Sequence, residues 1–374
     1  MKTLLKCIAV WMLILCTSVA FASDIEPMED GVVRIALLIS GDLGDMSFWD
    51  SANAGMQQFA ADHPDVVVDI IEMGSSDPTK YESTLTKMCN AAYDLIIVGS
   101  TDMREPLQRA AKKKKYADRR FIIFDTEIKD DKSAEYPNVH SIMFCQNEGG
   151  YLAGTLAALM TLEKGAENTA FIGGTKNDII NDFAFGFMQG VRDVNAATGQ
   201  NLKAYNSYIG DFTNSPKGAS LAASFYGNGV EVLFAAASQA GLGCIDSAKI
   251  SDKLIIGVDS DQFDYYADTD PEKAAHIVTS VLKRVDLALY HCCELFLEDR
   301  LTYGDLEVLG IEEAMIDLVE NDNYTALTSE ETRARLTQIK KDICSGALVV
   351  QSGLKRYTSQ AELNAIFDAL SPTR

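Results

Sequence analysis

Short runs of consecutive apolar residues recur along the chain, and most are followed by a longer segment that predicts a helix. The first set of runs covers residues 33–39, 66–73, 95–98, 121–124 and 140–144, with helices expected over 47–62, 78–92, 103–116 and 148–162. The second set covers 169–172, 202–208, 232–235 and 254–258, with helices expected over 181–196, 216–227 and 241–250. The runs lack polar alternation, which is typical of parallel strands buried on both faces.

Two successive sets of strand–helix units predict an α/β fold with two similar lobes, each a parallel sheet flanked by helices. The last helical stretches are expected over residues 276–297 and 329–344, and we interpret them as segments that return to the lobes and brace a hinge. At 374 residues the chain is long enough for two domains.

The stretch VRIALLISGDLGDMSF, residues 33–48, forms the opening strand, loop and helix of this pattern. Ligands of open parallel sheets bind beyond the carboxyl ends of the strands, where this loop would lie. The loop is a poor phosphate site, because Asp42 and Asp45 would repel an anion. Two carboxylates beside Phe48 instead indicate a neutral or cationic ligand with hydrogen-bond donors and a flat face. The alternative is that both aspartates only cap the following helix.

The formal net charge of −21 argues against a nucleic-acid partner, because nothing would offset repulsion from phosphates. The one basic run, residues 112–115, is expected in the last turn of a helix, where it complements the helix dipole.

The first 22 residues match a secretory signal segment. Two lysines precede an apolar stretch, and the sequence AFA at residues 20–22 fits a small-x-small cleavage site before Ser23. The mature protein is therefore expected in a periplasmic or other extracytoplasmic space. Cys16 raises the alternative of a lipid anchor, although Leu15 stands where a small residue normally precedes the modified cysteine.

Cysteine and histidine spacing predicts neither a disulfide framework nor a metal site. The six cysteines after the signal segment are scattered, and most are expected to be buried as small apolar residues. The four histidines form no HxxxH pattern, and there is no CxxC. We also expect no cofactor, since the chain has no dinucleotide fingerprint.

Further candidate site residues follow the predicted strands, at the sheet edge where a ligand would bind. Repetition of acids and aromatics at this edge in both lobes favours a binding role over isolated helix caps. These candidates are Asp125 after FIIF, Phe212 in GDFTNSPKG, Gly241 in ASQAGLG, Asp259 and Asp261 after LIIGV, and Lys283 in TSVLKR.

The series of motifs resembles the basic membrane protein family, which includes purine-nucleoside receptors of ABC transporters. The resembling stretches keep their order over roughly residues 31–350: GDLGDMSF, IIVGS, FIIFDTE, NEGGYLAGTLAAL, FIGG, FAFGFMQGV, YIGDFTNSPKGASLA, IIGVDSDQ and TSVLKRVD. The resemblance implies a two-lobed periplasmic binding protein of type I with three hinge crossings. It also implies a small-molecule ligand, a partner permease and a monomeric receptor.

The same resemblance assigns roles to the candidates. Phe48 and Phe212 match the aromatics that sandwich the base, one from each lobe, and Asp125 matches the acid that contacts the base edge. Asp259 matches the acid that binds the ribose hydroxyls, with Asp261 as its rival, and Gly241 and Lys283 match further ribose contacts. Trp49 stands where the family usually has asparagine, so it either packs in the core or enlarges the stacking surface.

The expected division of the chain is a signal segment over 1–22, a first lobe over 30–144 and 282–315, a second lobe over 145–281 and 316–350, and a C-terminal extension over 351–374. The favoured function is a transport receptor. The alternatives are a sensory binding protein without a transporter and an exported nucleosidase, whose acids would assist glycosidic cleavage. An enzyme is disfavoured, because the chain carries no nucleophile-elbow motif and no metal-ligand spacing.

Overall fold

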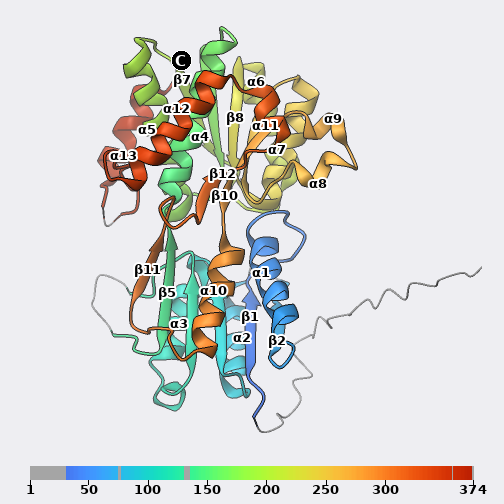
Figure 1. The fold of residues 1–374 in the computed structure, drawn as a ribbon, viewed down its shortest axis with the longest axis vertical. Coiled ribbons are helices and arrows are strands. Elements are labelled where there is room, and N and C mark those ends of the chain that lie inside the picture. Colours follow the sequence, from blue (N-terminus) through green and yellow to red (C-terminus); the bar gives the residue numbers. More distant parts are fainter. Residues whose placement is uncertain (1–30, 75–76, 130–134, 356, 373–374) are drawn as a thin grey trace, which may run out of the picture.

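The computed structural model describes residues 31–74, 77–129, 135–355 and 357–372. The predicted signal segment, its cleavage site and Cys16 lie outside these residues. Two lobes stand end to end, each built on a six-stranded sheet with helices packed on it (Figure 1). This arrangement confirms the α/β class predicted from the apolar runs.

The first sheet has the strand order β11-β5-β4-β3-β1-β2, and all neighbouring strands in it are parallel. Its strands are β1 (Arg34–Ile39), β2 (Val67–Glu72), β3 (Leu95–Gly99), β4 (Arg120–Phe124), β5 (Val139–Phe144) and β11 (Leu306–Leu309). The helices of this lobe are α1 (Phe48–Asp62), α2 (Pro78–Asn90), α3 (Arg104–Ala111) and α10 (Val285–Leu297).

The second sheet repeats this order as β12-β10-β9-β8-β6-β7, except that β12 is antiparallel to β10. Its strands are β6 (Asn168–Gly173), β7 (Lys203–Tyr208), β8 (Val230–Ala236), β9 (Leu254–Asp259), β10 (Ile277–Lys283) and β12 (Ile316–Leu318). Its helices are α4 (Gln146–Glu163), α5 (Asp178–Thr198), α6 (Ser215–Gly227), α7 (Ser238–Ser251), α8 (Asp264–Ala267), α9 (Pro271–Ala274), α11 (Asp322–Leu327), α12 (Glu330–Cys344) and α13 (Gln360–Leu370). Among the described helices, none is long and apolar enough to cross a membrane.

The chain passes between the two sheets three times. It leaves the first sheet after β5 and enters α4, returns from β10 into α10 at Arg284, and crosses again between β11 and β12 over residues 310–315. The crossings lie between the lobes (Figure 1). Each lobe is therefore assembled from segments that are distant in the sequence.

Two of the predicted helices are wrong in extent. Residues 276–297 form strand β10 followed by helix α10, because the run IVTSV is buried on both faces and such a run cannot be distinguished from a buried helix by periodicity alone. The helix predicted over 103–116 ends at Ala111, and Lys113 is extended. Residues Lys114–Tyr116 then form a separate 3-10 turn, so the basic run lies beyond the end of α3 and not in its last turn.

Glycines allow α4 and α5 to pack at backbone distance. A Cβ atom on Gly150 would lie 2.2 Å from the carbonyl oxygen of Phe183, and one on Gly186 would lie 2.0 Å from that of Asn147. No larger residue fits at either position. Close packing against α4 fixes α5, whose first turns, including Ile180 and Phe183, line the space between the lobes.

The C-terminal segment packs on the second lobe through a buried carboxylate. Asp182 on α5 accepts hydrogen bonds from the Ser352 hydroxyl (2.9 Å), the Gly353 amide (2.5 Å) and the Gln146 amide (2.5 Å). Burial raises the pKa of Asp182 to about 7. Farther along, Ser359 and Glu362 form a capping box that starts α13.

Candidate functional site

A cavity of about 500 Å³ lies between the lobes, at the carboxyl ends of the strands of both sheets. Its size is within the range of roughly 300–1,000 Å³ found for small-molecule sites. The candidates that line it are Asp42, Asp45, Phe48, Trp49, Asp125, Phe212, Asp259 and Lys283. Gly241 and Asp261 do not line it.

Asp45 both caps a helix and contacts the opposite lobe. Its carboxylate accepts hydrogen bonds from the backbone amides of Ser47, Trp49 and Asp50 at 3.0–3.1 Å, which satisfies free donors at the start of α1. It also accepts a 2.7 Å hydrogen bond from the hydroxyl of Ser238 on α7. Asp45 therefore does cap the helix, but capping is not its only contact. Asp42, by contrast, is an exposed residue in the cavity wall.

The first lobe supplies an aromatic wall. The ring of Phe48 lies 4.8 Å from that of Trp49 in an edge-to-face arrangement and 5.5 Å from that of Phe124. Trp49 packs against Gly41, where a Cβ atom would lie 2.9 Å from the indole nitrogen. Trp49 thus packs on its own lobe and also lines the cavity.

Phe212 faces the cavity from the second lobe. Its ring covers Gly174, where a Cβ atom would lie 2.2 Å from the ring. The Phe212 carbonyl accepts a 2.8 Å hydrogen bond from the amide of Ala240, which holds the loop against α7. Within the described residues no ring contact joins Phe48 to Phe212, so the two rings line the cavity without stacking on each other.

A buried ion pair joins the lobes inside the cavity. Lys283, at the end of β10, pairs with Oδ1 of Asp125, which follows β4, and the lysine side chain is only 2% exposed. The ammonium group also lies 5.1 Å from the ring centroid of Phe48 and 5.4 Å from that of Phe144. Burial raises the pKa of Asp125, and the charge of Lys283 opposes that rise. The lysine is held by one carboxylate and aromatic faces.

Asp259 makes a second contact between the lobes. It is the last residue of β9 and has a φ of 66°, a left-handed conformation that is uncommon for a residue other than glycine. Its carboxylate accepts a short hydrogen bond from the Ser47 hydroxyl of the first lobe. Burial raises the pKa of Asp259 to about 6, although Lys283 and the Ser47 hydrogen bond lower it.

The loop before α1 reaches into the second lobe. The carbonyl of Met46 accepts a 3.3 Å hydrogen bond from the Gln262 amide, and that of Ser47 accepts one of 3.4 Å from the Ser260 hydroxyl. The Met46 side chain packs against a buried apolar cluster of the second lobe, against which Phe263 and Tyr265 also pack. These contacts hold the two lobes together at one side of the cavity.

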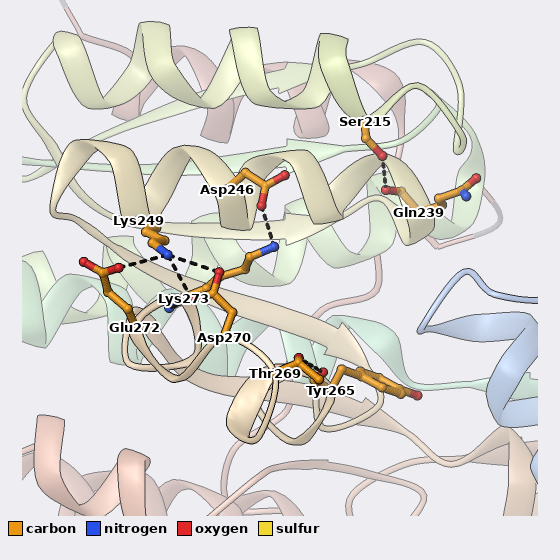
Figure 2. A network of polar contacts seen from close by, with 9 residues as sticks. All are labelled: Ser215, Gln239, Asp246, Lys249, Tyr265, Thr269, Asp270, Glu272 and Lys273. Atoms are coloured by element: carbon orange, nitrogen blue, oxygen red, sulfur yellow. Dashed lines mark hydrogen bonds and ion pairs between the residues drawn. The ribbon is translucent and has the colours of Figure 1, made fainter.

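Ion pairs anchor the segment after β9, which contacts the loop before α1 (Figure 2). Lys249 on α7 pairs with Asp270 at 2.9 Å and with Glu272 at 3.0 Å, and Lys273 pairs with Asp246 at 2.6 Å. Tyr265 lies at the other end of the same segment (Figure 2). The contacts with Met46 and Ser47 are thus made by a well-anchored segment.

The two candidates outside the cavity have structural roles. Gly241 is buried in the first turns of α7, whose cavity-lining residues are Ser238 and Gln239. Asp261 accepts hydrogen bonds from the Phe263 amide at 3.0 Å and from the Asn321 side chain at 3.1 Å, both within the second lobe. The geometry therefore favours Asp259 over its rival Asp261 as the acid that faces the cavity.

Several polar residues of the cavity were not predicted. They follow β3, β6, β7 and β8 at the same sheet edges as the predicted residues, so their place after an apolar run was the signal that could have identified them. These residues include Ser100, Thr101, Asp102, Thr175, Asn177, Asp211, Ser238 and Gln239.

Comparison with protein families gives a match over most of the chain. Residues 32–348 match the family described as ABC transporter substrate-binding protein PnrA-like. A CD4+ T-cell-stimulating antigen of Listeria monocytogenes is 30% identical over 322 residues, which cover 83% of this chain and 85% of that protein. The ABC transporter nucleoside-binding protein BmpA of Lactococcus lactis is 28% identical, covering 74% of this chain and 77% of its own.

Solved structures agree with the fold. The crystal structure of an ABC transporter solute-binding protein from Aeropyrum pernix covers 90% of this chain and 99% of its own, with a TM-score of 0.77 at 23% identity. The match over residues 32–348 and the two-lobed fold lead to one assignment: the chain belongs to the PnrA-like family of ABC transporter substrate-binding proteins.

Proposed function

We propose that the cavity of this substrate-binding protein takes up a purine nucleoside or a closely related molecule, and that the two lobes close on it. The observation that carries the proposal is the convergence of Phe48 and Phe212 from opposite lobes on a cavity that also contains Asp125 and Asp259. Aromatic faces suit a flat base, and stacking adds about 0.5–1.5 kcal/mol beyond area burial. Carboxylates suit ring N–H groups and sugar hydroxyls.

The residues divide between the two parts of such a ligand. Phe48, with Trp49 beside it, and Phe212 stack on the base, and Asp125 accepts a hydrogen bond from its edge. Asp259 accepts hydrogen bonds from the ribose hydroxyls in place of the one it accepts from Ser47. Lys283 balances part of the negative charge of the acids around it. The relative from Lactococcus lactis, named a nucleoside-binding protein, supports the same class of ligand.

The charge of the cavity excludes phosphorylated ligands. Its lining contains Asp42, Asp45, Asp102, Asp125, Asp211 and Asp259, and Lys283 is the one basic residue among the described lining residues. A nucleotide phosphate would meet this excess of carboxylates, and the ammonium group of Lys283 is already paired with Asp125. The proposed ligand is therefore the nucleoside and not its phosphate.

We also propose where the protein acts and how ligand binding is passed on to a permease. The chain is exported as a monomer, cleaved after Ala22, and presents its closed form to a permease. The lobes comprise residues 30–144 with 282–315 and residues 145–281 with 316–350, except that Leu282 and Lys283 go with the second lobe, because β10 continues to Lys283 in the second sheet. Residues 351–374 form an extension. A ligand held by both lobes shifts the population toward the closed form by its differential affinity, so no chemical step is required. The mass of the exported protein tests the cleavage site.

Titration calorimetry with adenosine, guanosine, inosine, uridine, ribose and AMP tests the ligand class. We expect the purine nucleosides to bind most tightly and AMP not to bind. Phe48→Ala and Phe212→Ala should each weaken binding about tenfold without unfolding, because one stacking partner is lost. Phe263→Ala, which changes an aromatic residue of the second lobe outside the cavity, is the matched control.

Chromatography of the same samples distinguishes a receptor from a nucleosidase. A receptor returns the nucleoside intact, whereas release of free base would show glycosidic cleavage. Binding of AMP as tightly as adenosine would contradict the charge argument, and binding of none of the nucleosides would contradict the ligand class.

A further inference from the structure

Three side chains of different chemistry meet in the first lobe, away from the cavity. They are His140 on β5, Cys292 on α10 and Glu307 on β11, and the first two are buried. Nε2 of His140 lies 3.2 Å from Oε2 of Glu307, and Sγ of Cys292 lies 4.0 Å from the same oxygen. No two of the three atoms are more than 4.8 Å apart.

The orientation of the imidazole suits a metal ligand. Nδ1 of His140 lies 2.9 Å from the carbonyl oxygen of Thr302, which can only accept a hydrogen bond, so Nδ1 carries a proton. In the neutral ring Nε2 is then an electron-pair donor facing Glu307. A backbone carbonyl that holds the other ring nitrogen in this way is the usual support of a metal-bound histidine.

The distances fit zinc. Zn–N and Zn–O bonds of about 2.0–2.2 Å and a Zn–S bond of about 2.3 Å, at tetrahedral angles, place ligand atoms roughly 3.4–3.6 Å apart. The Nε2–Oε2 and Sγ–Oε2 separations of 3.2 Å and 4.0 Å lie on either side of this range, and the Nε2–Sγ separation is at most 4.8 Å. A thiolate and a carboxylate would also neutralise the two charges of Zn²⁺, so the buried site would carry no net charge.

We propose that His140, Cys292 and Glu307 bind a zinc ion that joins β5, α10 and the edge strand β11. No local sequence pattern indicates this metal site, because the ligands are far apart in the chain and only the fold brings them together. His140 lies near the start of β5, whereas the ligand cavity lies at the carboxyl ends of the strands. The zinc site therefore has a structural role, with water completing the coordination on the half-buried side of Glu307.

The competing explanation is a plain ion pair, with a protonated His140 donating to Glu307. The first lobe offers a matched control, because Nε2 of His63 lies 2.5 Å from Oε1 of Glu294 and no third metal-binding side chain joins this pair among the described residues. Both pairs would respond alike to mutation if neither bound a metal.

Equilibrium dialysis of the reduced mature protein against ZnCl₂, followed by metal analysis, tests the site. We expect one zinc ion per chain and a rise in melting temperature on addition of zinc. Glu307→Gln and Cys292→Ser each change a direct ligand of the zinc ion. They should weaken zinc binding more than loss of an outer-shell partner does, which typically costs about 10- to 100-fold. His63→Gln and Cys344→Ser, the latter at an exposed cysteine, should bind zinc like the wild type.

Cobalt(II) provides a second measurement that does not depend on the stability of the variants. Binding through Cys292 should give a thiolate-to-cobalt charge-transfer band in the wild type, and the band should be retained in Cys344→Ser. The proposal is overturned if the wild type binds no zinc, if Glu307→Gln binds it as tightly as the wild type, or if the cobalt complex lacks the band.

Discussion

Asp125 and Asp259 occupy equivalent positions in the two lobes and have different partners. Asp125 directly follows β4 and Asp259 ends β9, and each of these strands is the fourth of its lobe in chain order. Both residues have a left-handed backbone, with φ of 59° for Asp125 and 66° for Asp259. Asp125 is paired with the ammonium group of Lys283, whereas Asp259 accepts a hydrogen bond from the hydroxyl of Ser47. The same place in the fold therefore carries two kinds of contact between the lobes.

The different partners suggest different roles for the two carboxylates. The charge of Asp125 is balanced inside the protein, so this carboxylate is part of the structure that joins the lobes. Asp259 accepts from a neutral hydroxyl, which a hydroxyl of the ligand can replace without leaving a charge unpaired. We therefore expect changes at the first pair to affect stability in addition to the proposed contact of Asp125 with the base, and changes at the second to affect mainly binding.

The largest expected effect is on the Lys283–Asp125 pair. Lys283→Met should lower the free energy of unfolding by about 3–5 kcal/mol, because it leaves Asp125 buried without its cation. Urea denaturation at pH 8 measures this. The double variant Asp125→Asn, Lys283→Met removes the unpaired charge and should recover much of the loss. If the double variant is no more stable than Lys283→Met alone, the pair is not what stabilises this region.

The second effect is on ligand affinity and its pH dependence. Asp259→Asn should abolish tight nucleoside binding. In the wild type, affinity should fall as the pH drops below the pKa of about 6 for Asp259, by up to about tenfold per pH unit, because a protonated carboxyl accepts hydroxyl protons poorly. Calorimetry between pH 8 and pH 5 measures both effects. Asp261→Asn is the matched control, since Asp261 lies in the same loop but outside the cavity.

The same variant separates binding from stability. The folded-state pKa of Asp259 lies above its unfolded value, because burial disfavours the ionised carboxylate. The free energy of unfolding should therefore fall as the pH rises from about 4 through about 6. Asp259→Asn should therefore be no less stable than the wild type at pH 8. A large loss of stability in this variant, comparable to that of Lys283→Met, would remove the distinction between the two carboxylates.

The smallest effect is expected for Ser47→Ala. It removes the hydroxyl that donates to the Asp259 carboxylate, a hydrogen bond to a charged group worth about 1.5–3 kcal/mol, and should shift the lobes toward the open form. Small-angle scattering should show a larger radius of gyration than for the wild type, and addition of nucleoside should reduce it. Ser83→Ala, at an exposed serine of α2, should leave the scattering unchanged. An unchanged radius for Ser47→Ala would show that this hydrogen bond does not favour closure.

Strands buried on both faces were the easiest part of the fold to predict, as β3 shows with all its residues buried. Strand β10 was missed because periodicity alone cannot distinguish its buried run from a buried helix. Thr279 and Ser280 are polar members of that run, yet both are fully buried and Thr279 donates to the Val319 carbonyl. Strands β11 and β12 are only four and three residues long. The three crossings between the lobes determine which strands β11 and β12 pair with, and no local sequence pattern predicts these crossings.

The site was predictable where a residue directly follows an apolar strand, as Asp125 and Asp259 do. Gly241 does not line the cavity because α7 begins three residues earlier, at Ser238, after an N-cap alanine that gives no sequence signal for a helix start. Asp261 lies outside the cavity because the chain turns after β9, where the Ser260 amide donates to the Val258 carbonyl at 2.8 Å. Such turns depend on contacts that the sequence alone does not reveal.

The late return of the chain to the first lobe has a consequence for folding. Glu307 on β11 is 167 residues beyond His140 on β5, although the two strands are neighbours in one sheet. At about 5–20 residues per second, β11 leaves the ribosome on the order of 10–30 s after β5. During this interval β5 is an open sheet edge that can pair with other chains. A newly made chain is therefore most prone to aggregate through its first lobe, and a chaperone that covers this edge would protect it until β11 arrives.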